Sequence, residues 1–268
     1  MPMANKIAVE YRVHDNPDAL SRAAADHFLE TAQAAVAAHG KARIAVSGGH
    51  TPKRTFELLA NPAERYLNTM PWGQIELYWV DERCVPPDHP DSNYRMTREA
   101  MLDKVPVRPE KVFRIEGELE PDAAAARYES TIRNEFRLEG AQMPRFDALG
   151  LGMGDDGHTA SLFPHTAALR ELSRLAVANH VPQQKESWRV TLTRPVIVEA
   201  SDIFFLIEGP AKADPLHRVL QGPYDPETLP SQFIQPKSGK LLFLLDKAAA
   251  ALLPPPDDHG VGRLEIER

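Results

Sequence analysis

Five short segments of the chain are apolar almost without interruption, and a polar stretch follows four of them. These segments are "RIAV" (43–46), "IELYWV" (75–80), "FDALGL" (146–151), "DIFFLI" (202–207) and "LLFLL" (241–245). Strands that are apolar on both faces are typical of parallel sheets that helices cover on each side. The pattern therefore predicts a three-layer αβα, Rossmann-like fold with a mostly parallel sheet.

Helical segments alternate with these strands. An alanine-rich stretch over 17–39 predicts a long helix that Gly40 ends, and Ser92 or Asn93 is a plausible cap for a helix over 92–103. Further helices are expected over 50–60, 122–140, 195–200, 210–222 and 246–253. A first strand is expected at 6–13, whereas the tail after Pro254 shows no pattern that predicts an element.

Two more strand-like segments, "RLAVANHV" and "WRVTLT", suggest a small subsidiary β element around residues 174–193. The chain shows no repeat of 20–50 residues and no low-complexity linker. A single domain over residues 1–268 is the simplest interpretation.

Composition narrows the possible partners. The chain has 268 residues, a formal net charge of −7 and one cysteine, Cys84. This charge gives no general attraction to nucleic acid or to an anionic membrane, and one cysteine excludes an internal disulfide. The N-terminus lacks a signal-peptide core, and no apolar run approaches the roughly 20 residues of a membrane-spanning helix. We expect a soluble, cytoplasmic protein.

Polar clusters follow four of the apolar strands: "SGGHTPK" (47–53), "DERCVPPDHPDSN" (81–93), "GMGDDGHTAS" (152–161) and "EGPAK" (208–212). In open α/β sheets, ligands bind beyond the carboxyl ends of the strands. If the strands are parallel, the four clusters meet at one edge of the sheet. The sequence therefore predicts a site there.

The cluster "SGGHTPK" indicates an anion site. Gly48 and Gly49 allow the backbone to approach a ligand, and the helix that follows presents free N–H groups. Ser47, Thr51 and Lys53 add donors. The glycine spacing matches neither the P-loop nor the dinucleotide-binding pattern, and a simple strand-to-helix turn is the alternative.

The cluster "VDERC" places three charged side chains at the end of a strand. Arg83 has the donors to hold a phosphate or a carbonyl oxygen, and Asp81 can accept a sugar hydroxyl or act as a base. The alternative is a surface loop of salt bridges. Cys84 is expected to fill space rather than to react.

The cluster "GMGDDGHTASLFP" carries Asp156 and His158, two residues apart. In a loop, residues at this spacing can cooperate, and an imidazole that a carboxylate orients suits general acid–base work. The partner of His158 can be Asp156 or Asp81, and the sequence leaves both open. A polar loop with a capping aspartate is the alternative.

Two other chemistries fit this cluster poorly. A metal site needs more ligands than the pair supplies, and although His50, His89 and His165 are candidates, their spacing is not that of a zinc motif. Ser161 lacks the surroundings of a nucleophile elbow. Two later cations, Arg189 and Lys212, flank strand ends and can neutralise a phosphate, or they can be ordinary surface charges.

Taken together, the chain resembles the 6-phosphogluconolactonases. The resemblance rests on "SGGHTPK", "VDERCVPPDHPDSNY", "LGLGMGDDGHTASLFP", "RVTLT" and "GPAKA", in the family's order. It implies hydrolysis of 6-phospho-D-glucono-1,5-lactone to 6-phosphogluconate, the second step of the oxidative pentose phosphate pathway. It also implies the fold shared with glucosamine-6-phosphate deaminases, a phosphorylated sugar lactone as the partner, a monomer or homodimer, and no metal or organic cofactor.

One residue separates this resemblance from the related deaminases. Those enzymes look like "DGHIAFNEP", with a glutamate before the proline that assists opening of the sugar ring. This chain has Phe163 at that position, and an apolar ring cannot transfer the proton. Two alternatives to the lactonase stay open: a deaminase-like isomerase and a non-catalytic sugar-phosphate sensor.

Overall fold

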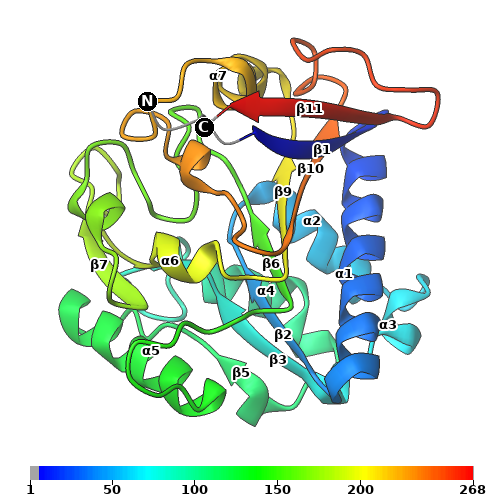
Figure 1. The fold of residues 1–268 in the computed structure, drawn as a ribbon. Helices are drawn as coiled ribbons and strands as arrows, with labels where there is room; N and C mark the ends of the chain where they lie inside the picture. The colour runs from blue at the N-terminus through cyan, green and yellow to red at the C-terminus, as the bar shows by residue number, and fades with distance from the viewer. Residues whose placement is uncertain (1–5, 268) are drawn as a thin grey trace.

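The computed structural model describes residues 6–267, and its centre is a mostly parallel sheet (Figure 1). Within these residues the sheet has eight strands, in the spatial order β11 (Val261–Glu267), β1 (Lys6–His14), β10 (Lys240–Asp246), β9 (Asp202–Ile207), β6 (Ala148–Leu151), β2 (Ala42–Val46), β3 (Ile75–Trp79) and β5 (Val112–Phe113). The five apolar segments form five neighbouring parallel strands, from β10 to β3. The expected parallel sheet is thus confirmed.

Helices cover this sheet, and α1 and α5 lie on opposite sides of it in Figure 1. The helices are α1 (Pro17–His39), α2 (His50–Leu59), α3 (Tyr66–Thr69), α4 (Asn93–Ala100), α5 (Pro121–Phe136), α6 (Arg194–Ile197) and α7 (Ala213–Gln221). Short 3₁₀ turns occupy Trp72–Gln74, Leu102–Lys104, Pro109–Lys111, Ala167–Arg170, Pro210–Lys212 and Pro230–Phe233. Among the described residues, no helix has both the length and the apolar character to span a membrane.

The ends of α1 and α4 follow from local chemistry. The Asn16 side chain accepts a hydrogen bond from the backbone of Ala19 at the start of α1, and Gly40 ends that helix at φ 82°. Ser92 caps α4 by accepting from the backbone N–H of Arg95, as the sequence predicts. The start of α4 and the end of α1 thus lie where the sequence predicts them.

A second, antiparallel sheet stands beside the first. It contains β4 (Asp81–Arg83), β8 (Trp188–Leu192) and β7 (Ala176–His180), which confirms the expected β element and adds a strand to it. The chain leaves the large sheet at the end of β3 and enters the small sheet two residues later. The backbone N–H of Leu192 donates to the carbonyl of Val80 at this junction (2.8 Å), so the two sheets are joined there.

One expectation near the C-terminus is wrong, and the tail forms a strand where the sequence predicted no element. Residues 247–252 form turns rather than a helix, and the tail forms β11, which pairs antiparallel with β1. The alanine run is too short to sustain a helix before the three prolines at 254–256, and the Asp246 carboxylate instead accepts from the backbone N–H of Ala249 (2.7 Å).

Candidate active site

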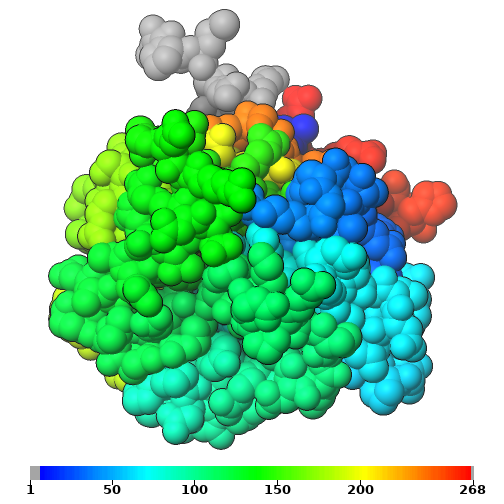
Figure 2. All heavy atoms as spheres, turned by 90° about the horizontal axis from the view of Figure 1, so that it is seen from below, coloured from blue at the N-terminus to red at the C-terminus, as the bar shows by residue number. Residues whose placement is uncertain are grey.

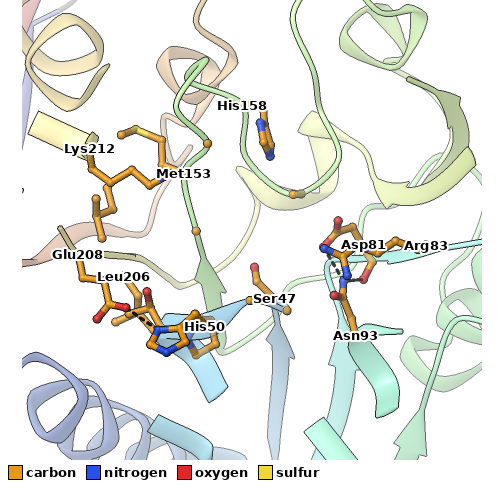
Figure 3. A pocket seen from close by; sticks show the side chains of 18 of the residues that line it. Ser47, His50, Asp81, Arg83, Asn93, Met153, His158, Leu206, Glu208 and Lys212 are labelled. Atoms are coloured by element: carbon orange, nitrogen blue, oxygen red, sulfur yellow. Dashed lines mark hydrogen bonds and ion pairs between the residues drawn. The ribbon is translucent and has the colours of Figure 1, made fainter. Parts of the chain in front are cut away.

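The four polar stretches meet at a cavity of about 410 Å³ at the carboxyl ends of the parallel strands (Figure 3). Of the residues singled out in the sequence, the wall contains Ser47, Gly48, Gly49, Thr51, Asp81, Arg83, His158, Arg189 and Lys212. Asp156 stands behind His158 and contacts it directly. The predicted convergence therefore brings all of these residues to one place.

The glycine turn between β2 and α2 leaves room for the side chain of Asn93 and for a ligand. A Cβ on Gly48 would lie 1.8 Å from Oδ1 of Asn93, so only glycine fits against that side chain. Gly49 has φ 114°, in a region that glycine favours. Within the described residues, α2 begins without a side-chain cap or an acidic residue in its first turn. Its first N–H groups can therefore bind an anion.

The hydroxyl of Ser47 has a structural partner. It donates to the carbonyl oxygen of Gly150 (2.8 Å) and so ties β2 to β6 beneath the cavity. Ser47 is buried, with 6% of its surface exposed. Its contribution to the cavity wall is thus a fixed backbone position more than a free hydroxyl.

His158 projects into the cavity (Figure 3) and pairs with Asp156. Its Nδ1 lies 2.6 Å from Oδ1 of Asp156, and its backbone N–H donates to the same oxygen (3.1 Å). Burial alone would raise the pKa of Asp156, but the bonds and charge of His158 outweigh it and hold that pKa below its usual value. An ionised carboxylate at Nδ1 favours the tautomer whose Nε2 can accept a proton.

The loop around this pair depends on its glycines. A Cβ on Gly154 would lie 2.1 Å from Nδ1 of His158 and 2.6 Å from Oδ1 of Asp156. Gly157 has φ 75°, which turns the chain between the two partners. These two glycines thus have a direct role in bringing the carboxylate to the imidazole.

Asp81, the other carboxylate left open by the sequence, has different partners. Its Oδ2 accepts from the Ser161 hydroxyl (2.6 Å), and its carbonyl oxygen accepts from the Asn93 amide (3.0 Å). Asp156 is therefore the carboxylate that contacts His158. Ser161 is fully buried and committed to Asp81, an arrangement unlike that of an exposed nucleophile.

Phe163 lies between His158, on the loop that follows β6, and strand β8 of the small sheet. Its ring is fully buried and stacks on the His158 ring, with 3.9 Å between centroids and 23° between planes. The guanidinium carbon of Arg189 lies 5.3 Å from the Phe163 centroid. The aromatic ring therefore sits against both the imidazole and a cation.

Arg83 and Arg189 stand opposite each other on neighbouring strands of the small sheet. An Nη of Arg83 donates to the carbonyl of Asp91 (2.5 Å), and an Nη of Arg189 lies 3.4 Å from the Gln184 side-chain oxygen. The Nε of each is buried and has no partner among the described residues. Burial lowers the pKa of Arg189, but a guanidinium stays charged near neutral pH. Both arginines retain donors for an anionic ligand.

Lys212 differs from the arginines in its exposure. Its ammonium pairs with a carboxylate oxygen of Asp155 at 2.5 Å, and a quarter of its side chain is exposed. It comes from the 3₁₀ turn after β9, and Figure 3 shows it on the opposite side of the cavity from Arg83. The cavity thus carries positive charge on two sides.

Sequence reasoning gave no role in the site to three polar residues of this region. Asn93 and Glu208 line the cavity, and Glu82 accepts from the backbone N–H groups of Asn93 (2.7 Å) and Tyr94 (2.8 Å) at the start of α4. Glu208 pairs with His50 (2.9 Å), and its second oxygen is buried without a partner among the described residues. Its place directly after a predicted strand was the available signal.

The chain is similar to known proteins along most of its length. Residues 15–243 match the family described as glucosamine-6-phosphate isomerases/6-phosphogluconolactonase. A 6-phosphogluconolactonase of Synechocystis is 41% identical and covers 82% of this chain and 88% of its own length. One from Treponema pallidum is 37% identical over 75% of this chain and 82% of its own.

Solved structures agree with these sequence matches. The structure of 6-phosphogluconolactonase from Trypanosoma cruzi has a TM-score of 0.82 and 29% identity, and the match covers 93% of this chain and 98% of that one. A monomeric glucosamine-6-phosphate deaminase, at 20% identity and a TM-score of 0.73 over 90% of this chain and 99% of its own, shares the fold.

Proposed function

Because the chain belongs to the family of glucosamine-6-phosphate isomerases and 6-phosphogluconolactonases, we propose that its cavity hydrolyses 6-phospho-D-glucono-1,5-lactone to 6-phospho-D-gluconate. This is the second step of the oxidative pentose phosphate pathway. The observation that carries the choice within the family is Phe163, which is buried against His158 where the deaminases have a glutamate. The site therefore retains a base for ester hydrolysis but lacks the glutamate that assists ring opening in the deaminase pattern.

In the proposed reaction, His158 acts as the general base. Its Nε2 takes a proton from a water molecule, whose oxygen attacks C1 of the lactone, while Asp156 fixes the imidazole through Nδ1. The resulting tetrahedral intermediate carries an oxyanion, which Arg83 or backbone N–H groups of the 152–157 loop stabilise. His158 then returns the proton to the ring oxygen as the bond between that oxygen and C1 breaks.

The phosphate of the substrate is assigned to the α2 end of the cavity. The backbone around Gly48, Gly49 and Thr51 supplies N–H donors there, and Arg189 and Lys212 supply positive charge from the two sides. Phosphate binding then holds the lactone in register with His158, so that binding energy remote from C1 serves the reaction.

A direct assay tests the proposal. Purified protein is mixed with 6-phosphogluconolactone and with unphosphorylated gluconolactone, and acid release is followed after spontaneous hydrolysis is subtracted. We expect rapid turnover of the phosphorylated lactone and a much lower kcat/KM for the other. Equal kcat/KM values would contradict the phosphate site.

Two outcomes would point to the alternatives instead. Release of ammonia from glucosamine 6-phosphate would indicate a deaminase. Binding of the phosphorylated lactone without turnover would indicate a sensor, although the pairing of Asp156 with His158 favours catalysis.

The remaining properties are proposals of the same kind. We expect residues 1–268 to act as one domain, in the cytoplasm, as a monomer or a homodimer. Size-exclusion chromatography with light scattering separates the two oligomeric states, and cell fractionation tests the location.

A further inference from the structure

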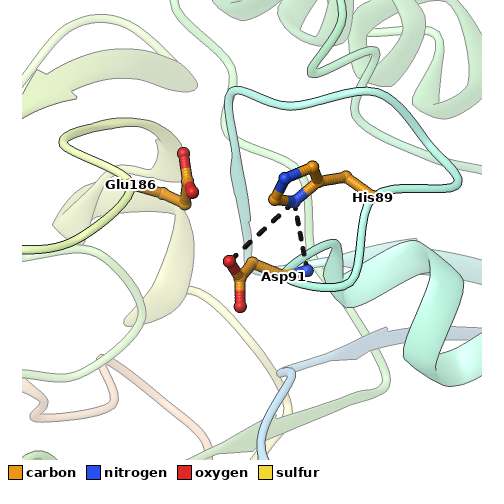
Figure 4. Close-up of side chains that lie close together, drawn as sticks. All are labelled: His89, Asp91 and Glu186. Atoms are coloured by element: carbon orange, nitrogen blue, oxygen red, sulfur yellow. Dashed lines mark hydrogen bonds and ion pairs between the residues drawn. The ribbon is translucent and has the colours of Figure 1, made fainter.

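Two loops that contact Arg83 and Arg189 bring together three side chains that can bind a metal (Figure 4). His89 and Asp91 lie on the loop after β4, and Glu186 lies in the turn between β7 and β8. One ligand atom from each lies within 4.8 Å of the others, and Nδ1 of His89 is 3.9 Å from Oδ2 of Asp91. All three side chains are half-buried. The cluster thus joins segments that are distant in the sequence.

The donors suit a divalent cation of borderline hardness. Imidazole nitrogen and carboxylate oxygen are both donors that Zn²⁺ binds in proteins, and water can supply the fourth ligand. Tetrahedral zinc with bonds of about 2.0–2.2 Å places its donor atoms roughly 3.4 Å apart, so the three side chains need to close by an ångström or so. The backbone N–H of Asp91 donates to Nδ1 of His89 (3.2 Å), so Nδ1 is unprotonated, and a metal that binds this nitrogen replaces that hydrogen bond.

A second observation shows that this place attracts cations. The ammonium of Lys185 lies 2.5 Å from Oδ2 of Asp91, the same oxygen that faces His89. Lys185 is three-quarters exposed, so its side chain can leave for solvent. A metal ion and this ammonium therefore compete for one carboxylate.

We propose that His89, Asp91 and Glu186 form a zinc-binding site that Lys185 occupies when zinc is absent. The site lies behind both arginines of the cavity. The carbonyl of Asp91 holds Arg83, and Gln184, two residues before Glu186, contacts Arg189. Zinc bound there links these two loops and so restrains the groups that contact both guanidinium groups. This inference does not depend on the reaction that the cavity catalyses.

The experiment measures zinc affinity and thermal stability on the full chain after treatment with a chelator. Zinc is titrated by calorimetry and by competition with a chromophoric chelator. We expect His89→Ala and Glu186→Gln each to weaken binding at the site by at least about tenfold, and to remove most of the zinc-induced rise in Tm. Asp88→Asn, an exposed carboxylate on the same loop, is the matched control and should bind zinc as the parent does.

Lys185→Ala gives the sharpest outcome. It removes the competing ammonium, so we expect zinc to bind several-fold more tightly than to the parent chain. A generally damaged loop would bind zinc more weakly, so tighter binding separates competition from misfolding. The proposal is wrong if the parent binds no zinc, if the His89 and Glu186 variants bind as the parent does, or if Lys185→Ala fails to increase the affinity.

Discussion

The large parallel sheet and the small antiparallel sheet contribute different kinds of groups to the cavity. The large sheet supplies loops after its strands, and these loops carry His158 and Lys212, each with about a quarter of its side chain exposed. The small sheet supplies residues of its strands, and Asp81 and Arg189 are more than nine-tenths buried. Side chains from loops can meet solvent and substrate, whereas the strand pairing holds the buried charges in place.

Phe163 lies where the two contributions meet, because its ring contacts both His158 and Arg189. We thus assign proton transfer to His158, which lies on a loop. The buried charges around it, Asp81 and Arg189, lie on strands of the small sheet. The cavity therefore has a reactive side, formed by the loops of the large sheet, and a rigid side, formed by the strands of the small sheet. Substitutions can test the two sides separately.

The largest expected effect comes from the reactive side. His158→Ala removes the proposed general base, so kcat should fall by about 10²–10⁴-fold while KM stays within a few-fold. Steady-state kinetics on the phosphorylated lactone measure this. His165→Asn is the control, since His165 is exposed on the same loop at φ 60°, a conformation that asparagine tolerates. Retention of kcat in His158→Ala would assign the base elsewhere.

An intermediate effect on KM is expected when the cation that each sheet supplies to the cavity is removed. Arg189→Ala should raise KM by about 10–100-fold, because it removes a buried guanidinium with a free donor. Lys212→Ala should raise KM by only about 3–10-fold, since that ammonium is partly exposed and already paired with Asp155. Lys237→Ala, an exposed lysine paired with Glu199, serves as the control. A larger effect at Lys212 would reverse the comparison.

The smallest effect concerns stability and pH. The pKa of Asp156 is lower in the folded protein than usual, so its ionised form stabilises the fold above the ordinary aspartate pKa of about 4, and this stabilisation is lost as the pH falls through the lower pKa of the folded state. The difference in urea midpoint between the parent and Asp156→Asn should therefore shrink over that range. A constant difference would show that the pair with His158 does not lower this pKa.

Local sequence patterns were sufficient for most of the architecture. The apolar segments predicted the parallel strands because burial on both faces leaves a continuous hydrophobic run, and Ser92 and Gly40 marked helix ends because capping is a local interaction. The same reasoning failed after β10, where the Asp246 carboxylate and three prolines outweigh the helix propensity of a short alanine run. It also missed β11, an edge strand whose pairing with β1 is non-local.

For the site, the sequence by itself determined which residue types gather after each strand, and it singled out Phe163 as the departure from the deaminase pattern. Only the tertiary structure decided that Asp156 rather than Asp81 contacts His158, that Ser161 and Asn93 hold Asp81, and that Glu208 lines the cavity. The reason is physical, because the residues that a loop contains can be read directly from the sequence. The choice among several carboxylates for one imidazole depends instead on distances of a few ångströms between segments that only the packed sheets bring together.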